Sequence, residues 1–342
     1  MKTPQQPINS PFTMKSTSTQ VMRGTNLKGM TAIVTGGYSG IGLKVTESLV
    51  RSGAHVIIPA RNLKNAQNAA GHLPNVEFAV LVLMDTLSID AFATDFLNTH
   101  HQLDLLIACA GIMFAPLKRD NRGNEAQLST NYLGHFQLAA KLYPALKAAG
   151  KSRVIMVTSR AQSWNGVDFN DPNFSTREYD PRVAYAQSKV ADILFAVELD
   201  KRAQHDGIRA FAVHPGLVPG TGLGRFINSN AYLQNAMRFL MNDLKATRLI
   251  STRNALKAYL HGEQEYDYFK TVSQGAAPIL WSATSTLLRD KGGVFVEDSN
   301  IGKEVGGDST SKFGVRPWSI DAQLAERLWS LGEKLTGVKF DI

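Results

Sequence analysis

Tyr185 and Lys189 stand four residues apart in the stretch YAQSK. On a helix, that spacing places the two side chains one above the other on the same face. A phenol ordinarily loses its proton near pH ~10, and a neighbouring ammonium group favours the phenolate and lowers the pKa. The pair could therefore serve as a general acid or base near neutral pH, although the same spacing also occurs in solvated surface pairs.

A glycine-rich segment far upstream, residues 35–42 with the sequence TGGYSGIG, gives this pair a context. It follows the apolar run 31–34, which is typical of a buried strand, and it precedes a helical pattern. Strand, glycine turn and helix in that order are typical of a dinucleotide-binding fingerprint. Gly36 would allow the tight turn, Gly40 the approach of a pyrophosphate, and Gly42 the close packing of helix on strand. The spacing is GxxxGxG rather than GxGxxG, and a flexible turn is the alternative interpretation.

Strand-like and helical patterns alternate along the rest of the chain. The strand-like runs are residues 31–34, 55–59, 76–82, 105–109, 153–158, 208–213 and 293–296. The helical patterns between them include residues 88–99, 130–149 and 188–204. This alternation predicts an α/β fold with one Rossmann-type, doubly wound parallel sheet and helices on both faces. In such a sheet, ligands bind beyond the carboxyl ends of the strands, where the strand order reverses.

Composition suggests one main domain. Residues 1–26 are predicted to be a flexible leader, because residues 1–20 are rich in Ser, Thr, Pro and Gln, and residues 17–27 could form a short capped helix. Residues 27–342 are predicted to be a single dinucleotide-binding domain. Within it, residues 162–182 are polar and rich in turns, and residues 222–270 are longer and contain an amphipathic part between Tyr232 and Ile250.

The bulk properties exclude several classes. The 342 residues are 44% hydrophobic and 19% charged, and Cys109 is the only cysteine, so no intramolecular disulfide can form and a reducing, cytoplasmic location is expected. No apolar run reaches the ~18 residues of a spanning helix. The net charge of +8 is scattered and includes no basic run, so nucleic-acid binding is not expected. No metal site is predicted.

One position points to the type of dinucleotide. An acidic residue about 20 positions after the glycines binds the ribose 2′-hydroxyl of NAD. Residues 54–63 contain no acid, and Arg61 lies there instead. A guanidinium group binds a 2′-phosphate with paired hydrogen bonds, and the Ser39 hydroxyl could add another. The charge therefore favours NADP over NAD, with a plain surface arginine as the competing interpretation.

Together, the glycine segment, Tyr185 and Lys189 resemble the short-chain dehydrogenase/reductase family over nearly the whole chain from about Leu27 onward. Within the family, the chain is most similar to the branch of retinol dehydrogenases and the WW-domain oxidoreductase. The closer likeness rests on residues 184–198 (AYAQSKVADILFAVE), 214–216 (HPG) and 324–337 (LAERLWSLGEKLTG).

The resemblance implies a catalytic tetrad. Ser159 would hydrogen-bond the substrate oxygen, and Tyr185 would give that oxygen a proton or take one from it. Lys189 would hold the nicotinamide ribose and depress the pKa of Tyr185. Asn131 would anchor a water that links Lys189 to solvent.

Cofactor contacts are expected along the same edge of the sheet. The glycine turn and the position after the second strand would supply Gly36, Tyr38, Ser39, Gly40, Ile41, Gly42 and Arg61. The resemblance adds Asp85, Thr86, Ala110, Gly111, Pro215, Gly216, Val218 and Thr221, besides Tyr185 and Lys189. The chain has Ala108 and Cys109 where the family has two asparagines, and Cys109 is expected to be a small buried residue rather than a reactive thiol.

The leading hypothesis is an NADP-dependent oxidoreductase that interconverts a carbonyl and an alcohol on a lipophilic small molecule, with residues 222–270 covering the substrate as a helical lid. Ordinary helix packing is the other interpretation of that segment. The alternatives are a secondary-metabolite ketoreductase and a non-catalytic NADP-binding module. Peripheral membrane contact by the amphipathic part could accompany catalysis, and either a monomer or a homodimer fits the helix faces.

Overall fold

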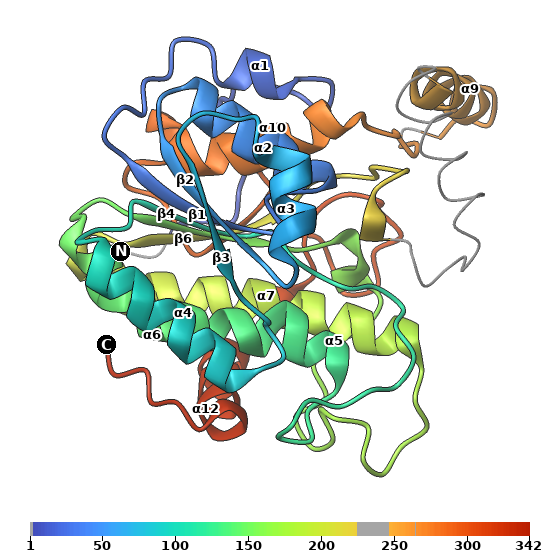
Figure 1. The fold of residues 1–342 in the computed structure, drawn as a ribbon. Coiled ribbons are helices and arrows are strands. Elements are labelled where there is room, and N and C mark those ends of the chain that lie inside the picture. The colour runs from blue at the N-terminus through green and yellow to red at the C-terminus, as the bar shows by residue number, and fades with distance from the viewer. Residues whose placement is uncertain (1–2, 224–245, 264) are drawn as a thin grey trace.

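Eight strands form one sheet in the computed structural model, which describes residues 3–223, 246–263 and 265–342 (Figure 1). Their order is β3-β2-β1-β4-β5-β6-β7-β8, and all neighbouring pairs are parallel except β7 and β8. The strands are β1 Thr31–Thr35, β2 His55–Ala60, β3 Val76–Val80, β4 Leu105–Ala108, β5 Arg153–Val157, β6 Arg209–His214, β7 Val294–Glu297 and β8 Asn300–Ile301. The doubly wound sheet is therefore confirmed, and the order reverses between β1 and β4.

Helices cover both faces of this sheet (Figure 1). They are α1 Ser18–Val21, α2 Gly40–Arg51, α3 Leu63–Ala70, α4 Thr86–Thr99, α5 Ala126–Leu128, α6 Gly134–Ala148, α7 Pro181–Ala203, α9 Ala246–Leu260, α10 Val272–Thr284, α11 Pro317–Ile320 and α12 Ala322–Thr336. One buried apolar cluster joins the sheet to α4, α6, α7 and α12, and a second joins it to α1, α2 and α10. Because both faces are buried, the central strands are apolar throughout rather than alternating.

Helix α7 begins earlier than the sequence pattern predicts. It starts at Pro181, and the Asp180 side chain accepts hydrogen bonds from Arg182 N and Val183 N. Aspartate as the N-cap and proline in the first turn are typical helix-start residues. Both Tyr185 and Lys189 therefore lie on this helix, within its first turns.

The pattern predicted as one helix over 130–149 is divided. A π-helical turn, η1, spans Ser129–Leu133, and α6 follows directly. Such turns are rare and often mark functional sites. Asn131 lies in this turn.

The N-terminal leader makes defined contacts. The predicted short helix is present as α1, with Thr17 and Gln20 forming a capping box. Ahead of it, the Gln5 side chain donates to Phe295 O (2.9 Å) and Gly302 O (2.6 Å) and accepts from Phe295 N (2.9 Å), which closes one end of the β7–β8 pair. Further along the leader, Ile8 N donates to the Asn300 side chain. The composition of the leader predicts a flexible segment. In the structure, Gln5 and Ile8 instead form hydrogen bonds with residues almost 300 positions later in the chain.

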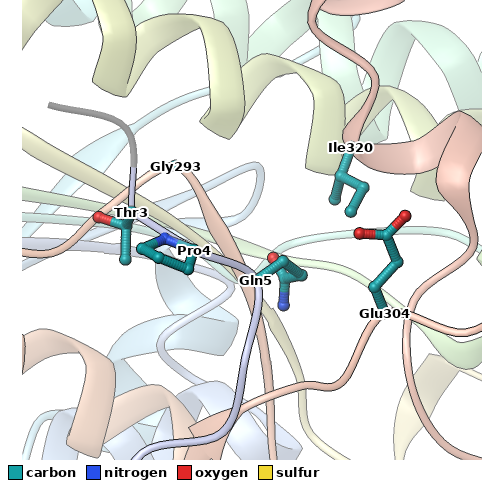
Figure 2. Close-up of a pocket in the computed structure, with 6 residues that line it drawn as sticks. All are labelled: Thr3, Pro4, Gln5, Gly293, Glu304 and Ile320. Carbon is teal, nitrogen blue, oxygen red and sulfur yellow. The ribbon is translucent and has the colours of Figure 1, made fainter.

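A cavity of about 330 Å³ lies beside this part of the leader (Figure 2). It is lined by Thr3, Pro4, Gln5, Gly293, Glu304 and Ile320. Gly293 immediately precedes β7, so the cavity is at the amino end of that strand and not at the edge where the predicted site residues lie.

Residues 224–245, which include most of the amphipathic part that begins at Tyr232, lie outside the described residues. Of the rest of that segment, α9 exposes Leu249, Leu256, Tyr259 and Leu260. A bridge between Leu217 and Phe269 joins the two ends of the segment at the sheet. Among the described helices, none is both long and apolar enough to cross a membrane.

Candidate active site

The predicted site residues gather where β1 and β4 end side by side. A Cβ on Gly36, which follows β1, would lie 3.1 Å from Ala110 Cα, in the loop that follows β4. Gly36 has φ +68°, a conformation that favours glycine. The two loops therefore meet at the reversal of strand order, which is the ligand-binding position of such sheets.

The glycine turn has the geometry that its spacing predicts. Gly40 has φ +52°, and a Cβ on Gly42 would overlap the Gly36 carbonyl oxygen, so only glycine lets α2 start this close to β1. Ser39 is the N-cap of α2, but its side chain makes no capping hydrogen bond. Its hydroxyl and the first N–H groups of α2 are thus available to an anion. Tyr38 and Ile41, also predicted here, pack partly buried against the core on this face.

Tyr185, Ser159 and Lys189 come together in the structure. Tyr185 is 3% exposed and lies over Lys189, whose Nζ is 5.9 Å from the centre of the phenol ring. The Ser159 side chain lies near the Tyr185 hydroxyl and lowers the pKa of that phenol. Lys189 Nζ donates to Val157 O at 2.9 Å, which ties α7 to the end of β5.

The pKa of Tyr185 is under two opposing influences. Burial raises it above the usual phenol value, whereas Lys189 and the Ser159 side chain act in the opposite direction without outweighing burial. Desolvation penalises the phenolate more than one ammonium group, itself paired with a carboxylate, can offset. In this state the phenol holds its proton at neutral pH.

That carboxylate belongs to Asp192, which the sequence analysis missed. Asp192 Oδ2 accepts a hydrogen bond from Lys189 Nζ at 2.8 Å, and the Asp192 side chain is 1% exposed. Burial raises the pKa of Asp192 to about 7, against the pull of Lys189. Burial alone would lower the pKa of Lys189, but Asp192 and Tyr185 together raise it, so the lysine stays charged. An acid three positions after Lys189 on the same helix was the available signal.

Asn131 is anchored by its side chain. Its Oδ1 accepts from Ile112 N (2.9 Å), and its Nδ2 donates to Ile112 O (3.0 Å) and to Ser188 Oγ (2.9 Å). A Cβ on Gly111 would lie 3.2 Å from Asn131 Oδ1 and 3.8 Å from Lys189 Nζ. The structure thus brings Asn131, Gly111 and Lys189 to one place. The role of Asn131 in holding water stays a prediction.

Thr35 and His135 form a buried frame behind these groups. Thr35 Oγ1 accepts from Cys109 N and Ala110 N, both at 3.0 Å, and lies 2.9 Å from His135 Nε2. His135 Nδ1 lies 2.8 Å from Asn131 O, a carbonyl that can only accept, so the proton is on Nδ1. Burial lowers the pKa of His135 to about 4.

The predicted adenosine-side residues have different surroundings. Arg61 directly follows β2, is exposed, and has no hydrogen bond or ion pair with any described residue. Asp85 is the N-cap of α4, where its carboxylate accepts from Leu87 N and Ser88 N. Capping uses one carboxylate oxygen, Oδ1. Thr86, next to it, has a buried hydroxyl with no hydrogen-bond partner among the described residues.

The loop after β6 contacts the glycine turn. Thr221 lies 3.5 Å from the Cβ position of Gly40, and Val218 packs against Gly275 of α10. Gly216, which follows the buried Pro215, has φ +90°, and a Cβ there would meet the Lys270 side chain. Lys270 is a second residue that the sequence analysis missed; its Nζ is 2.6 Å from Asp298 Oδ1.

Cys109 is not a reactive thiol in this structure. Burial raises its pKa to about 12, against the pull of Lys189. A thiol with so high a pKa carries almost no thiolate at neutral pH. The prediction of a small buried residue therefore agrees with its surroundings.

Apolar groups flank the phenol. Phe114 meets the Tyr185 ring edge-on with centroids 5.5 Å apart, and Met113 and Ala161 pack in the same cluster. Trp164 stacks on Phe114 at 6.3 Å and is 55% exposed. The buried Tyr185 hydroxyl, a potential proton donor, therefore lies beside a wall of apolar side chains.

The arrangement could transfer a proton to or from an oxygen held between Ser159 and Tyr185, beside a cradle for a phosphate-bearing ligand. Comparison with known proteins agrees with this chemistry. The family described as short chain dehydrogenase matches residues 30–231. A probable oxidoreductase of Streptomyces lividans is 36% identical over 313 residues, which cover 90% of this chain and 97% of that protein.

Two further matches extend the comparison. Retinol dehydrogenase 13 of Mus musculus is 30% identical over 318 residues, covering 91% of this chain and 85% of that protein. The Pseudomonas aeruginosa RhlG/NADP complex superposes with a TM-score of 0.57 at 20% identity, covering 80% of this chain and 95% of that one. The match to the RhlG/NADP complex supports the fold alone.

Proposed function

The chain belongs to the short-chain dehydrogenase/reductase family, and we propose that it is an NADP-dependent enzyme that interconverts a carbonyl and an alcohol on a lipophilic small molecule. One observation carries the proposal: the protonated, buried phenol of Tyr185 lies near Ser159 and over the charged Lys189. A secondary-metabolite ketoreductase would use the same groups and remains the runner-up for the substrate.

The residues fit the dinucleotide. The uncapped Ser39 hydroxyl and the start of α2 suit its phosphates, and Gly111 leaves space beside Lys189 for its ribose. Arg61, exposed and without a partner among the described residues, suits a 2′-phosphate, which a carboxylate at that position would repel. NADP supplies the hydride; the protein supplies position and charge.

Proton transfer falls to the chain. In carbonyl reduction, Tyr185 donates its proton to the oxygen as negative charge develops there, and Ser159 donates a hydrogen bond to the same oxygen. Lys189 stabilises the resulting phenolate, which favours donation at the moment of reaction. In alcohol oxidation the same groups act in reverse.

Asp192 acts as a positioning residue. Together with Val157 O, it holds the Lys189 ammonium group in one place, and it keeps that group charged despite burial. An isolated buried ammonium group would tend to lose its proton. The Asp192 counter-charge therefore favours the charged form of the lysine that assists Tyr185.

The apolar wall supports a lipophilic substrate. Met113, Phe114 and Trp164 lie beside the phenol, and the α9 side chains exposed to solvent would suit a helical lid over such a molecule. Burying apolar substrate surface there contributes about 25 cal/mol per Å². Cys109, the only cysteine of the sequence, suits the reducing cytoplasm in which we place the enzyme.

The test removes one hydroxyl. Tyr185→Phe should lower kcat by about 10²–10⁴-fold with NADPH and a panel of apolar ketones and aldehydes, because the proton donor is lost. NADPH binding, followed by fluorescence, should stay within about threefold, because cofactor binding rests mostly on other groups.

The matched control is Tyr143→Phe, which removes a hydroxyl bonded to Asp206 on another part of the molecule and should keep nearly full activity. Retention of more than about 10% of wild-type activity by Tyr185→Phe would refute the acid–base role.

A further inference from the structure

Three side chains of metal-ligating types meet at the amino ends of the strands, whereas Tyr185 lies at their carboxyl ends. His55 is the first residue of β2, Glu77 lies in the neighbouring edge strand β3, and His100 is the C-cap of α4. One ligand atom from each lies within 4.8 Å of the other two. All three side chains are partly exposed, so an ion can reach them.

The two distances from Glu77 match a tetrahedral ion. Glu77 Oε2 lies 3.4 Å from His55 Nε2 and also 3.4 Å from His100 Nε2. Zinc bonds of about 2.0–2.2 Å in tetrahedral geometry separate neighbouring ligand atoms by about 3.4 Å. Octahedral bonds of about 2.1 Å at right angles would separate them by about 3.0 Å. The His55–Glu77 contact is also a hydrogen bond, but at 3.4 Å it is longer than a charge-assisted one of about 2.7–2.9 Å.

Thr99 fixes which nitrogen of His100 is free. The Thr99 hydroxyl donates to Asp95 O (2.8 Å), so it can only accept from His100 Nδ1, which lies 2.8 Å away. His100 Nε2 is then the unprotonated nitrogen of the neutral ring, and its lone pair points toward a carboxylate. A lone pair facing a carboxylate oxygen is unfavourable, so either a proton on Nε2 or a metal cation must lie between the two atoms.

The rings are also held in place. His100 stacks on Phe96 with centroids 4.6 Å apart and 9° between planes, and on His55 at 5.8 Å and 20°. Glu77 is fixed by strand pairing, opposite Ile57 of β2. Ligands held this way lose little freedom when an ion binds.

From these observations we propose that His55, Glu77 and His100 bind one Zn²⁺ ion, with a water molecule in the fourth position. Two imidazole nitrogens and a carboxylate are a ligand set that zinc accepts. The ion would clip β3, the exposed edge strand, to β2 and to the end of α4. At the amino ends of the strands it is remote from the proposed proton-transfer site, so its role is structural.

The experiment uses the full chain without a histidine tag, stripped with a chelator and titrated with Zn²⁺ by calorimetry. We expect one ion per chain and a higher Tm with zinc, because an ion that binds only the folded state stabilises it. His55→Ala, Glu77→Gln and His100→Ala should each weaken binding at least about tenfold. His101→Ala, which removes an exposed neighbouring imidazole, should bind within about twofold of wild type.

Two further measurements keep the proposal falsifiable if a ligand variant folds poorly. Thr99→Val leaves all three ligands in place and should still weaken zinc binding about tenfold, because the His100 tautomer is no longer fixed. Co²⁺ in the same site should give the intense visible absorption of tetrahedral coordination. Absence of stoichiometric zinc binding to the wild type, equal binding by His100→Ala and His101→Ala, or a weak octahedral cobalt spectrum would overturn the proposal.

Discussion

The two edges of the sheet carry polar clusters of similar size that were assembled in different ways. At the carboxyl edge, two short contiguous motifs identify the site: the turn at 35–42 and the first turns of α7, to which Ser159 and Asn131 are added from other elements. At the amino edge, His55, Glu77 and His100 come from three separate elements. A site built on local motifs can be found in a sequence, whereas a site built by strand pairing emerges only when the fold is known.

The largest effect that would test this comparison comes from the glycine turn. Gly42→Ala should lower kcat/KM with NADPH by about 10²-fold or more, because the new methyl group overlaps the Gly36 carbonyl and displaces the start of α2. Gly222→Ala is the matched control, since no described atom lies within 4 Å of its Cβ position. Equal activity of the two variants would show that the motif is not the anchor of the carboxyl edge.

The next effect concerns Arg61, which we propose selects the cofactor at that edge. Arg61→Ala should raise KM for NADPH by about 10–100-fold and leave KM for NADH nearly unchanged, because a hydrogen bond to a charged group contributes about 1.5–3 kcal/mol. Lys64→Ala, which removes a neighbouring exposed cation on α3, should change neither. An equal rise for both cofactors would remove the argument for NADP.

Asp192 is expected to have a smaller effect, which appears in the pH dependence of kcat/KM for alcohol oxidation. Its carboxyl group, with a pKa raised to about 7 by burial, is protonated below that pH and charged above it. The charged form raises the pKa of Tyr185, whose phenolate is needed for alcohol oxidation. Asp192→Asn should therefore abolish the inflection near pH 7 and move the oxidation profile to lower pH, with less than about a tenfold change in maximal rate.

Measurement of kcat/KM for alcohol oxidation between pH 5 and 10 or so checks this prediction, with wild type as reference. A profile that keeps its inflection would show that another group titrates there. A shift to higher pH would show that Lys189 loses its proton once Asp192 no longer pairs with it.

The smallest expected effect lies at the amino edge. Gln5→Ala removes three hydrogen bonds to Phe295 and Gly302 and should lower the free energy of unfolding by about 1–3 kcal/mol, measured by urea denaturation. NADPH kinetics should not change. Gln6→Ala, which changes an exposed neighbour, should unfold at the same urea concentration as the wild type. A Gln5→Ala protein as stable as the wild type would show that the leader does not stabilise the sheet.

Strand positions could be predicted closely from the sequence. Buried parallel strands are short apolar runs bounded by turns, and the run at 105–109 corresponds to β4, Leu105–Ala108. The start of α7 was predicted at Ser188 instead of Pro181. This helix is buried on nearly all sides, so it has no apolar stripe, and the Asp180–Pro181 start was overlooked.

Other features of the structure have no local signal in the sequence. The π-helical turn that holds Asn131 continues directly into α6, so the sequence pattern predicts one helix where the structure has two parts. The raised pKa of Tyr185 depends on how completely α7 is covered, which spacing alone does not reveal. Gln5 is an ordinary polar residue whose partners are brought to it only by the last strands of the sheet.

The Thr35–His135 pair sets a limit on how this enzyme can respond to acidity. Because burial lowers the pKa of His135 to about 4, the imidazole remains neutral through the physiological range, and the bonds from Thr35 to Cys109 N and Ala110 N keep one arrangement. The buried frame formed by Thr35 and His135 is therefore insensitive to pH in this range. Among the described groups at the proton-transfer site, Asp192, Lys189 and Tyr185 are then the ones whose titration we expect to change turnover.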